Sequence, residues 1–200
     1  MTHTAEGKYW SGASGLVLPV PNKKAFPPAF RDKSRLTYYS SLFNSIEVNS
    51  SFYKVPQAAT VGKWAASVPE NFVFTFKLWR DITHAKGFVY DPQQVLRFME
   101  VISPAGTKKG CLLIQFPPSL TIDKFGQVAE MLDLLQDIAP AHGWRVAVCM
   151  AVSRMAQPMN LEIRRRKTRC TCTICTRRFF DYSVTITRSL PIATRGAISD

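Results

Sequence analysis

The chain has 200 residues, 46% of them apolar, and its 26 Lys and Arg against 14 Asp and Glu give a formal net charge of +12. This length and apolar content are enough for one hydrophobic core. No apolar run is long enough to span a bilayer, so the sequence predicts a soluble globular domain. The N-terminus lacks the pattern of a secretory signal, so the sequence predicts a cytoplasmic protein whose five cysteines are thiols.

The excess charge is concentrated in the last quarter of the chain. Residues 1–148 contain 16 Lys and Arg against 11 Asp and Glu, whereas residues 149–200 contain ten against three and hold four of the five cysteines. This change in composition predicts a folded domain over residues 8–150 and a separate basic segment over residues 151–200. Because that segment has no sustained hydrophobic period, we expect it to be disordered or an aberrant, out-of-frame continuation.

Five strand-like segments follow one another along residues 8–150, and each is rich in apolar or β-branched residues. They are predicted over residues 9–14, 45–50, 72–78, 111–116 and 145–150. The fourth is nearly all apolar, which is typical of a parallel strand that is covered on both sides.

Helix-like segments fill the intervals between these strands. The first starts at Asp32 or Ser34, the second at Thr60, the third at Asp91 followed by Pro92, and the fourth at Asp123. Alternating strands and helices predict an α/β fold with a parallel sheet. A closed (β/α)₈ barrel needs eight such units and about 250 residues. The sequence therefore predicts a partial TIM barrel of about five parallel strands, followed by an irregular basic tail.

Polar side chains occur where the predicted strands end. Glu47 and Asn49 alternate along the second strand and would share one face of it, with Ser14, Lys77 and Gln115 at the ends of the first, third and fourth strands. Catalytic groups of TIM barrels come from this end of the strands. The alternation therefore predicts a polar barrel mouth.

Several motifs carry a family resemblance. They are YWSGASG over residues 9–15, FNSIEVNSSFY over 43–53, FVFTFK over 72–77, ITH over 82–84 and LLIQFPP over 112–118. Residues 8–148 thereby resemble the DUF72 (YecE-like) family. The resemblance implies a TIM-barrel-like fold and no established activity. Related sequences would continue the fifth strand with a Glu, where this chain has Cys149.

The residue types at the strand ends permit acid/base chemistry, because proximity and partial burial separate the pKa values of neighbouring groups. We assign catalytic roles to Glu47 as base, to Lys77 as electrostatic stabiliser or acid, and to His84 as proton shuttle or phosphate contact. Substrate-binding roles go to the remaining candidates, Ser14, Asn49, Trp79 and Gln115. Two structural alternatives stay open, an ion pair between Glu47 and Lys77 and a solvated His84.

No cofactor is predicted, and no motif fixes a metal site. A divalent metal at Glu47, Asn49 and His84 is the weaker alternative. In the tail, Cys170, Cys172 and Cys175 resemble a zinc knuckle but lack a nearby fourth ligand. The predicted partner is a small-molecule or phosphorylated ligand, and the basic run over residues 164–167 predicts non-specific binding to nucleic acid.

Together these observations favour a cytosolic TIM-barrel enzyme or small-ligand binder with acid/base or phosphate-directed, hydrolase-like chemistry at the C-terminal strand ends. They do not decide between an enzyme and a binding protein. We expect an incomplete barrel to impair this activity, because unpaired strand edges favour aggregation. The alternatives are non-specific nucleic-acid binding through the tail and an inactive truncated product.

Overall fold

A parallel five-stranded sheet forms the centre of the computed structural model, which describes residues 9–150. Every strand pairs in parallel with the next one along the chain, so that the spatial order is the sequence order. The strands are β1 (Gly12–Ser14), β2 (Ser45–Val48), β3 (Val73–Lys77), β4 (Lys109–Phe116) and β5 (Arg145–Met150). This succession is the strand arrangement of a TIM-type α/β barrel.

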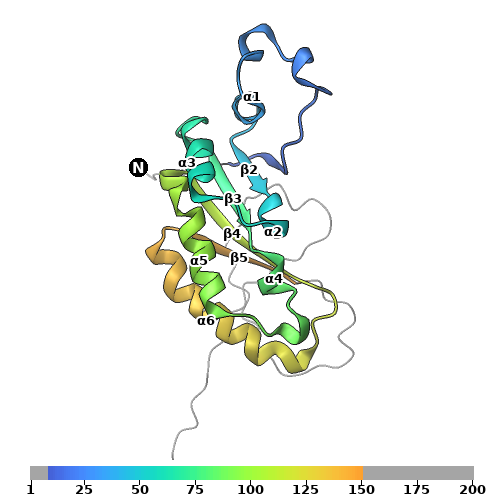
Figure 1. The fold of residues 1–200 in the computed structure, drawn as a ribbon, viewed down its shortest axis with the longest axis vertical. Helices are drawn as coiled ribbons and strands as arrows, with labels where there is room; N and C mark the ends of the chain where they lie inside the picture. The colour runs from blue at the N-terminus through green and yellow to red at the C-terminus, as the bar shows by residue number, and fades with distance from the viewer. Residues whose placement is uncertain (1–8, 151–200) are drawn as a thin grey trace, which may run out of the picture.

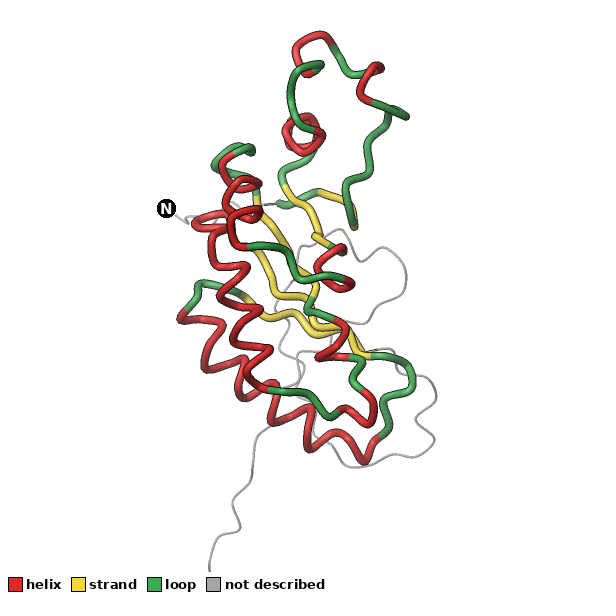
Figure 2. Tube along the Cα trace, viewed as in Figure 1, coloured by secondary structure: helices red, strands yellow, loops and turns green. Residues whose placement is uncertain are grey.

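Four helices connect the strands, and two one-turn helices follow β2 and β3. The connecting helices are α1 (Arg35–Leu42), α3 (Ala58–Ala66), α5 (Pro92–Ile102) and α6 (Phe125–Ala141), and the short ones are α2 (Ser50–Tyr53) and α4 (Arg80–Thr83). Short 3₁₀ turns occupy Lys23–Ala25, Pro28–Phe30, Lys86–Phe88, Ser103–Lys108 and Ile122–Lys124. Figure 1 shows α3, α5 and α6 side by side on one face of the sheet, and Figure 2 shows the strands behind them.

The strand register gives the sheet one apolar and one polar face. Paired residues of neighbouring strands point to the same side, because side chains alternate along each strand. The side that faces the helices carries fully or almost fully buried residues, Ile46, Val48, Phe74, Phe76, Leu112, Ile114 and Phe116. They pack against the buried faces of α5 and α6 in one core. The opposite face, the inner face of the curved sheet, carries the polar residues.

The sheet is strongly curved. In a flat sheet β1 and β5 would lie about 19 Å apart, four strand spacings. Yet Arg145, the first residue of β5, places its guanidinium carbon 5.3 Å from the centroid of the Trp10 ring, which lies just before β1. The two outer strands of the described sheet therefore approach each other at their N-terminal ends, as strands on opposite sides of a barrel do.

The phenol of Tyr39 binds β1 to the sheet. Its hydroxyl accepts a hydrogen bond from the Ala13 amide at 2.6 Å and donates one to the Ser45 carbonyl at 3.0 Å, and burial raises the pKa of Tyr39. A Cβ at Gly12 would overlap the Ser45 carbonyl oxygen. Glycine is therefore required at position 12 of β1.

Most of the predicted elements are confirmed, with differences at their ends. Ser34 caps α1 by accepting from the Thr37 amide, and Asp91 caps α5 by accepting from the Gln93 amide. However, β1 starts only at Gly12, β2 ends at Val48, α3 starts before Thr60, and β4 starts at Lys109. Pro140 lies in the last turn of α6 rather than after it. The earlier end of β2 has consequences for the candidate site.

The expectations about residues 151–200, including the basic run and the cysteine motif, lie outside the described residues and remain predictions. Within residues 9–150, no helix combines the length and the apolar character that a bilayer crossing requires.

A buried lysine stabilises the end of α3. Lys108 is 6% exposed, and its ammonium group donates to the carbonyls of Ala65 and Val68 at 2.7 Å each. The same group lies 3.2 Å from the exposed carboxylate of Glu70. Carbonyls at a helix C-terminus lack partners within the helix, so a cation there is favourable.

We expect Lys108→Met to lower the free energy of unfolding by about 2 kcal/mol, because two buried carbonyls lose charged donors. Urea unfolding followed by circular dichroism measures the change. Lys63→Met is the matched control, since Lys63 is an exposed residue of α3. Equal stability of the Lys108 variant and the wild type would contradict the capping role.

Candidate functional site

The inner face of the sheet carries a row of polar residues near the C-terminal strand ends. Ser14 pairs with Glu47, and Glu47 pairs with Thr75, so three neighbouring strands place a hydroxyl, a carboxylate and a hydroxyl side by side. Lys77 lies two residues beyond Thr75 on the same face and is the last residue of β3. The polar mouth that the alternation predicts is therefore present in the described sheet.

Glu47 is the most unusual member of this row. It is 6% exposed, and among residues 9–150 its carboxylate has neither a hydrogen bond nor an ion pair. Burying a charged or polar group without a partner costs free energy, so such groups are normally paired. Glu47 is therefore the leading candidate for a functional acid in the described sheet.

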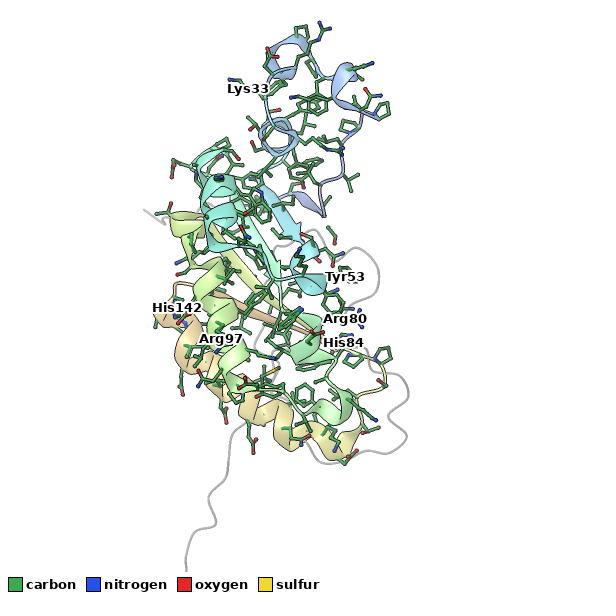
Figure 3. All side chains as sticks on the ribbon, in the orientation of Figure 1. Lys33, Tyr53, Arg80, His84, Arg97 and His142 are labelled. Atoms are coloured by element: carbon green, nitrogen blue, oxygen red, sulfur yellow. The ribbon has the colours of Figure 1, made fainter. Side chains whose placement is uncertain are left out.

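A second group of side chains gathers around the buried ring of Phe52. The ammonium group of Lys77 lies 4.3 Å from the centroid of this ring, and the rings of His84 and Tyr53 contact it edge-on with centroids 5.0 Å away. Figure 3 shows Tyr53, Arg80 and His84 close together beside α2 and α4. We call Phe52, Tyr53, Lys77, Arg80 and His84 the rim cluster.

The short helix α2 positions Phe52. Asn49 leaves the strand with helical backbone angles, and its amide donates to the Glu47 carbonyl at 2.9 Å. The buried hydroxyl of Ser51 then lies 2.6 Å from the Val48 carbonyl and 2.7 Å from the Lys77 carbonyl. This single hydroxyl connects α2 to the ends of both β2 and β3, and it fixes the helix over the mouth.

The electrostatics of the rim cluster are dominated by positive charge. His84 is exposed as a residue, but partial desolvation of its ring, followed by the charges of Lys77 and Arg80, lowers its pKa and favours the neutral form. Thr83 Oγ1 lies 2.9 Å from His84 Nδ1 and fixes the ring. Arg80 has a distant, exposed partner in Asp81 at 3.9 Å, and such a pair neutralises little charge. An anion beside these groups would be attracted.

The segment after His84 has a strained backbone. Gly87 and Phe88 both have positive φ, at 64° and 58°. For a bulky residue such as Phe88 this conformation is unfavourable. The Phe88 ring is buried against Tyr90 and against Phe116 at the end of β4, with centroids 5.5 Å away in each case. Packing thus holds the segment beside the site.

The other candidates lie in different places. Asn49 is half-buried and lies off the strand, so the expected common face of Glu47 and Asn49 is wrong. Lys77 contacts Phe52 and forms no ion pair with Glu47, which rules out the structural pair considered above. Gln115 lies on the inner face of β4, two residues beyond Leu113, which pairs with Lys77 across the two strands. Trp79 packs against the core.

The metal alternative gains no support from the geometry. No group of three or more His, Cys, Asp and Glu side chains comes together within residues 9–150. Cys149 belongs to β5, but its side chain and the tail cysteines lie outside what the structure describes.

Sequence reasoning missed Phe52, Tyr53 and Arg80 as members of the site. The first two directly follow the second strand, so their position after a strand end was a usable signal. Arg80 starts a helix of four residues, which gives no periodic pattern.

The fold and the inner-face residues define a TIM-barrel-type α/β protein with a polar site at the C-terminal strand ends. The family described as "Protein of unknown function DUF72" matches residues 10–167, and the chain belongs to this family. A crystal structure of a DUF72 family protein from Enterococcus faecalis V583 shares the fold, with a TM-score of 0.51 and 19% identity over 70% of this chain and 50% of that one.

Two curated relatives are also similar. The UPF0759 protein YunF of Bacillus subtilis is 31% identical over 110 residues, which cover 52% of this chain and 39% of the relative. The UPF0759 protein YecE of Escherichia coli K12 is 26% identical over 100 residues, 50% of this chain and 37% of the relative. The matches thus span less than half the length of these curated relatives.

We expect Lys77→Met to raise the pKa of His84, because the variant removes a positive charge that opposes protonation. Nuclear magnetic resonance of the imidazole during a pH titration measures the value. Lys33→Met is the matched control, since Figure 3 places Lys33 at the far end of the molecule. An unchanged His84 titration in the Lys77 variant would show that the two groups are not coupled.

Proposed function

We propose that this DUF72 protein binds a small phosphorylated ligand at the inner mouth of its sheet and acts on it by acid/base chemistry of the hydrolase type. Glu47 is the base, and Lys77, Arg80 and His84 hold the phosphate. The observation that carries the proposal is the buried residue Glu47, whose carboxylate has no partner among residues 9–150, on the inner face next to a rim cluster with excess positive charge.

The acid and the cations lie at different depths on the inner face and would have different roles. Glu47 lies deeper on the inner face, level with Thr75, whereas Lys77 lies two residues nearer the rim. A phosphate at the rim would therefore have Glu47 on its inner side, where the carboxylate can activate a water for in-line attack, and its ester bond would point away from the carboxylate toward the rim. Preorganised cations stabilise the negative charge of a phosphoryl transition state without reorganisation.

The proposed step is hydrolysis of a phosphate monoester. Glu47 accepts a proton from water as the water oxygen forms a bond to phosphorus, and the bond between phosphorus and the ester oxygen breaks. The departing oxygen takes a proton from His84 in its protonated form, giving an alcohol and inorganic phosphate. Bound phosphate would favour that protonated form by offsetting the charges of Lys77 and Arg80.

The lowered pKa of His84 sets the sign of the pH dependence. In the free protein His84 is neutral at pH 7, and an anion stabilises the imidazolium, so binding takes up a proton. Binding of an anion therefore strengthens as the pH falls toward the pKa of His84. Sulfate is the suitable probe, because it does not itself titrate in this range.

We expect Lys77→Met to weaken the binding of inorganic phosphate about tenfold, because it removes one charged donor. Isothermal titration calorimetry on the full chain measures the affinity. Lys33→Met controls for the loss of one unit of net charge at a distant position. If both variants weaken binding equally, the anion does not bind at the rim cluster.

Glu47→Gln distinguishes a functional acid from a structural one. We expect the variant to be about as stable as the wild type, because the substitution keeps the shape of the side chain and no residue among 9–150 bonds to the carboxylate. Phosphate release from a set of phosphate monoesters should fall by about 10²-fold or more.

Thr75→Val changes a neighbouring inner-face residue at constant shape and serves as the control for Glu47→Gln. Unfolding curves and phosphate release are measured on the same preparations. A Glu47 variant that is less stable and equally active would assign the carboxylate a structural role.

A further inference from the structure

We infer that the ligand of this site carries a planar ring next to its phosphate, and that Tyr53 is the residue that selects it. The inference rests on the proposed function and names the class of ligand more closely, as phosphate monoesters of ring compounds. Tyr53 would form a stacking surface, while Lys77, Arg80 and His84 hold the phosphate.

The exposure of Tyr53 is the first observation. The residue is 63% exposed, although it lies on a helix that is otherwise fixed to the sheet through Ser51. Within residues 9–150, Tyr9 is the other strongly exposed aromatic residue, and it lies at the start of the described chain. Single exposed apolar residues are common on protein surfaces, so exposure alone assigns no role.

The orientation of the ring is the second observation. Tyr53 meets Phe52 nearly at right angles, with an interplanar angle of 88° and ring centroids 5.0 Å apart. Phe52 is itself buried, so it supports the tyrosine from one edge and fixes the direction of its plane. A supported ring loses little conformational entropy when a ligand stacks on it.

The place of Tyr53 relative to the cations is the third observation. Phe52 contacts Tyr53, the His84 ring and the Lys77 ammonium group at the same time. Figure 3 shows Tyr53 beside Arg80 and His84 and far from Lys33 and His142. The exposed ring and the excess positive charge are therefore parts of one surface.

A ligand that uses both parts needs a phosphate and a ring separated by a short link. Stacking of a planar ring on an aromatic side chain is favourable for any unsaturated ring, whatever its substituents. A phosphate ester with a small aliphatic group would make the charged contacts alone. The geometry therefore predicts a preference for ring-bearing monoesters.

Three probes test this preference on the full chain, namely inorganic phosphate, methyl phosphate and phenyl phosphate. Calorimetry at pH 8 keeps both esters as dianions, since the second pKa of a phosphate ester is about 6. We expect phenyl phosphate to bind about tenfold more tightly than methyl phosphate, as one stacking contact predicts. Tyr53→Ala should abolish this difference, with phenyl phosphate losing about tenfold more affinity than methyl phosphate.

Two further variants keep the test decisive. Tyr53→Phe retains the ring and should retain the preference for phenyl phosphate. This variant provides the test if circular dichroism shows that Tyr53→Ala does not fold. Tyr9→Ala removes the exposed tyrosine that lies away from the rim cluster and should change nothing.

The possible failures are distinguishable. If methyl and phenyl phosphate bind equally in a manner that depends on Lys77, the inference is overturned and the proposed function stands. The same holds if the preference survives in Tyr53→Ala. If none of the three probes binds, or if binding does not depend on Lys77, the proposed function falls and the inference falls with it.

Discussion

The parallel register of five successive strands is the constraint on which the rest of this structure depends. Because paired residues point to the same side, Ile46, Phe74 and Leu112 face the helices together, and the polar residues of the same strands are turned inward. A shift of one residue in β2 would exchange Glu47 with a core position. The fold therefore cannot bury its apolar face without also placing an acid on the inner face. The core and the site are consequences of the same pairing.

The rim cluster adds a second layer to this arrangement. Its organising residue is Phe52, an apolar side chain that brings a lysine, a histidine and a tyrosine together. Contacts of a cation and of ring edges with an aromatic ring are individually weak, so their geometry depends on how firmly Phe52 is held. Ser51 supplies this support by connecting α2 to β2 and β3. Small polar residues after a strand thus determine where the charged ones lie.

The sequence predicted the parts of the fold that are governed by local signals. The bounds of β3, β5 and α5 follow from their apolar runs and from the Asp91 cap with Pro92. The sequence also shows which strand ends carry polar residues. Glu47 and Lys77 lie on the inner face of the sheet, as the alternation of polar and apolar residues predicts. Asn49 was misplaced because nothing in its neighbourhood marks the end of β2, and a four-residue helix such as α2 is too short to have a period. The contact of Lys77 with Phe52, and the lack of a partner for Glu47 within the described part of the chain, are tertiary properties that alternation along one strand cannot reveal.

The positive charge of the rim cluster offers a way to test whether this site binds a ligand. Lys77 and Arg80 both disfavour the charged form of His84, and a bound anion would offset this effect. Any compound that neutralises this charge binds the native state and not the unfolded one, and it shifts the melting temperature upward by mass action. A metabolite collection screened by thermal shift, with the Lys77→Met chain run in parallel, would single out ligands of this mouth before any reaction is known.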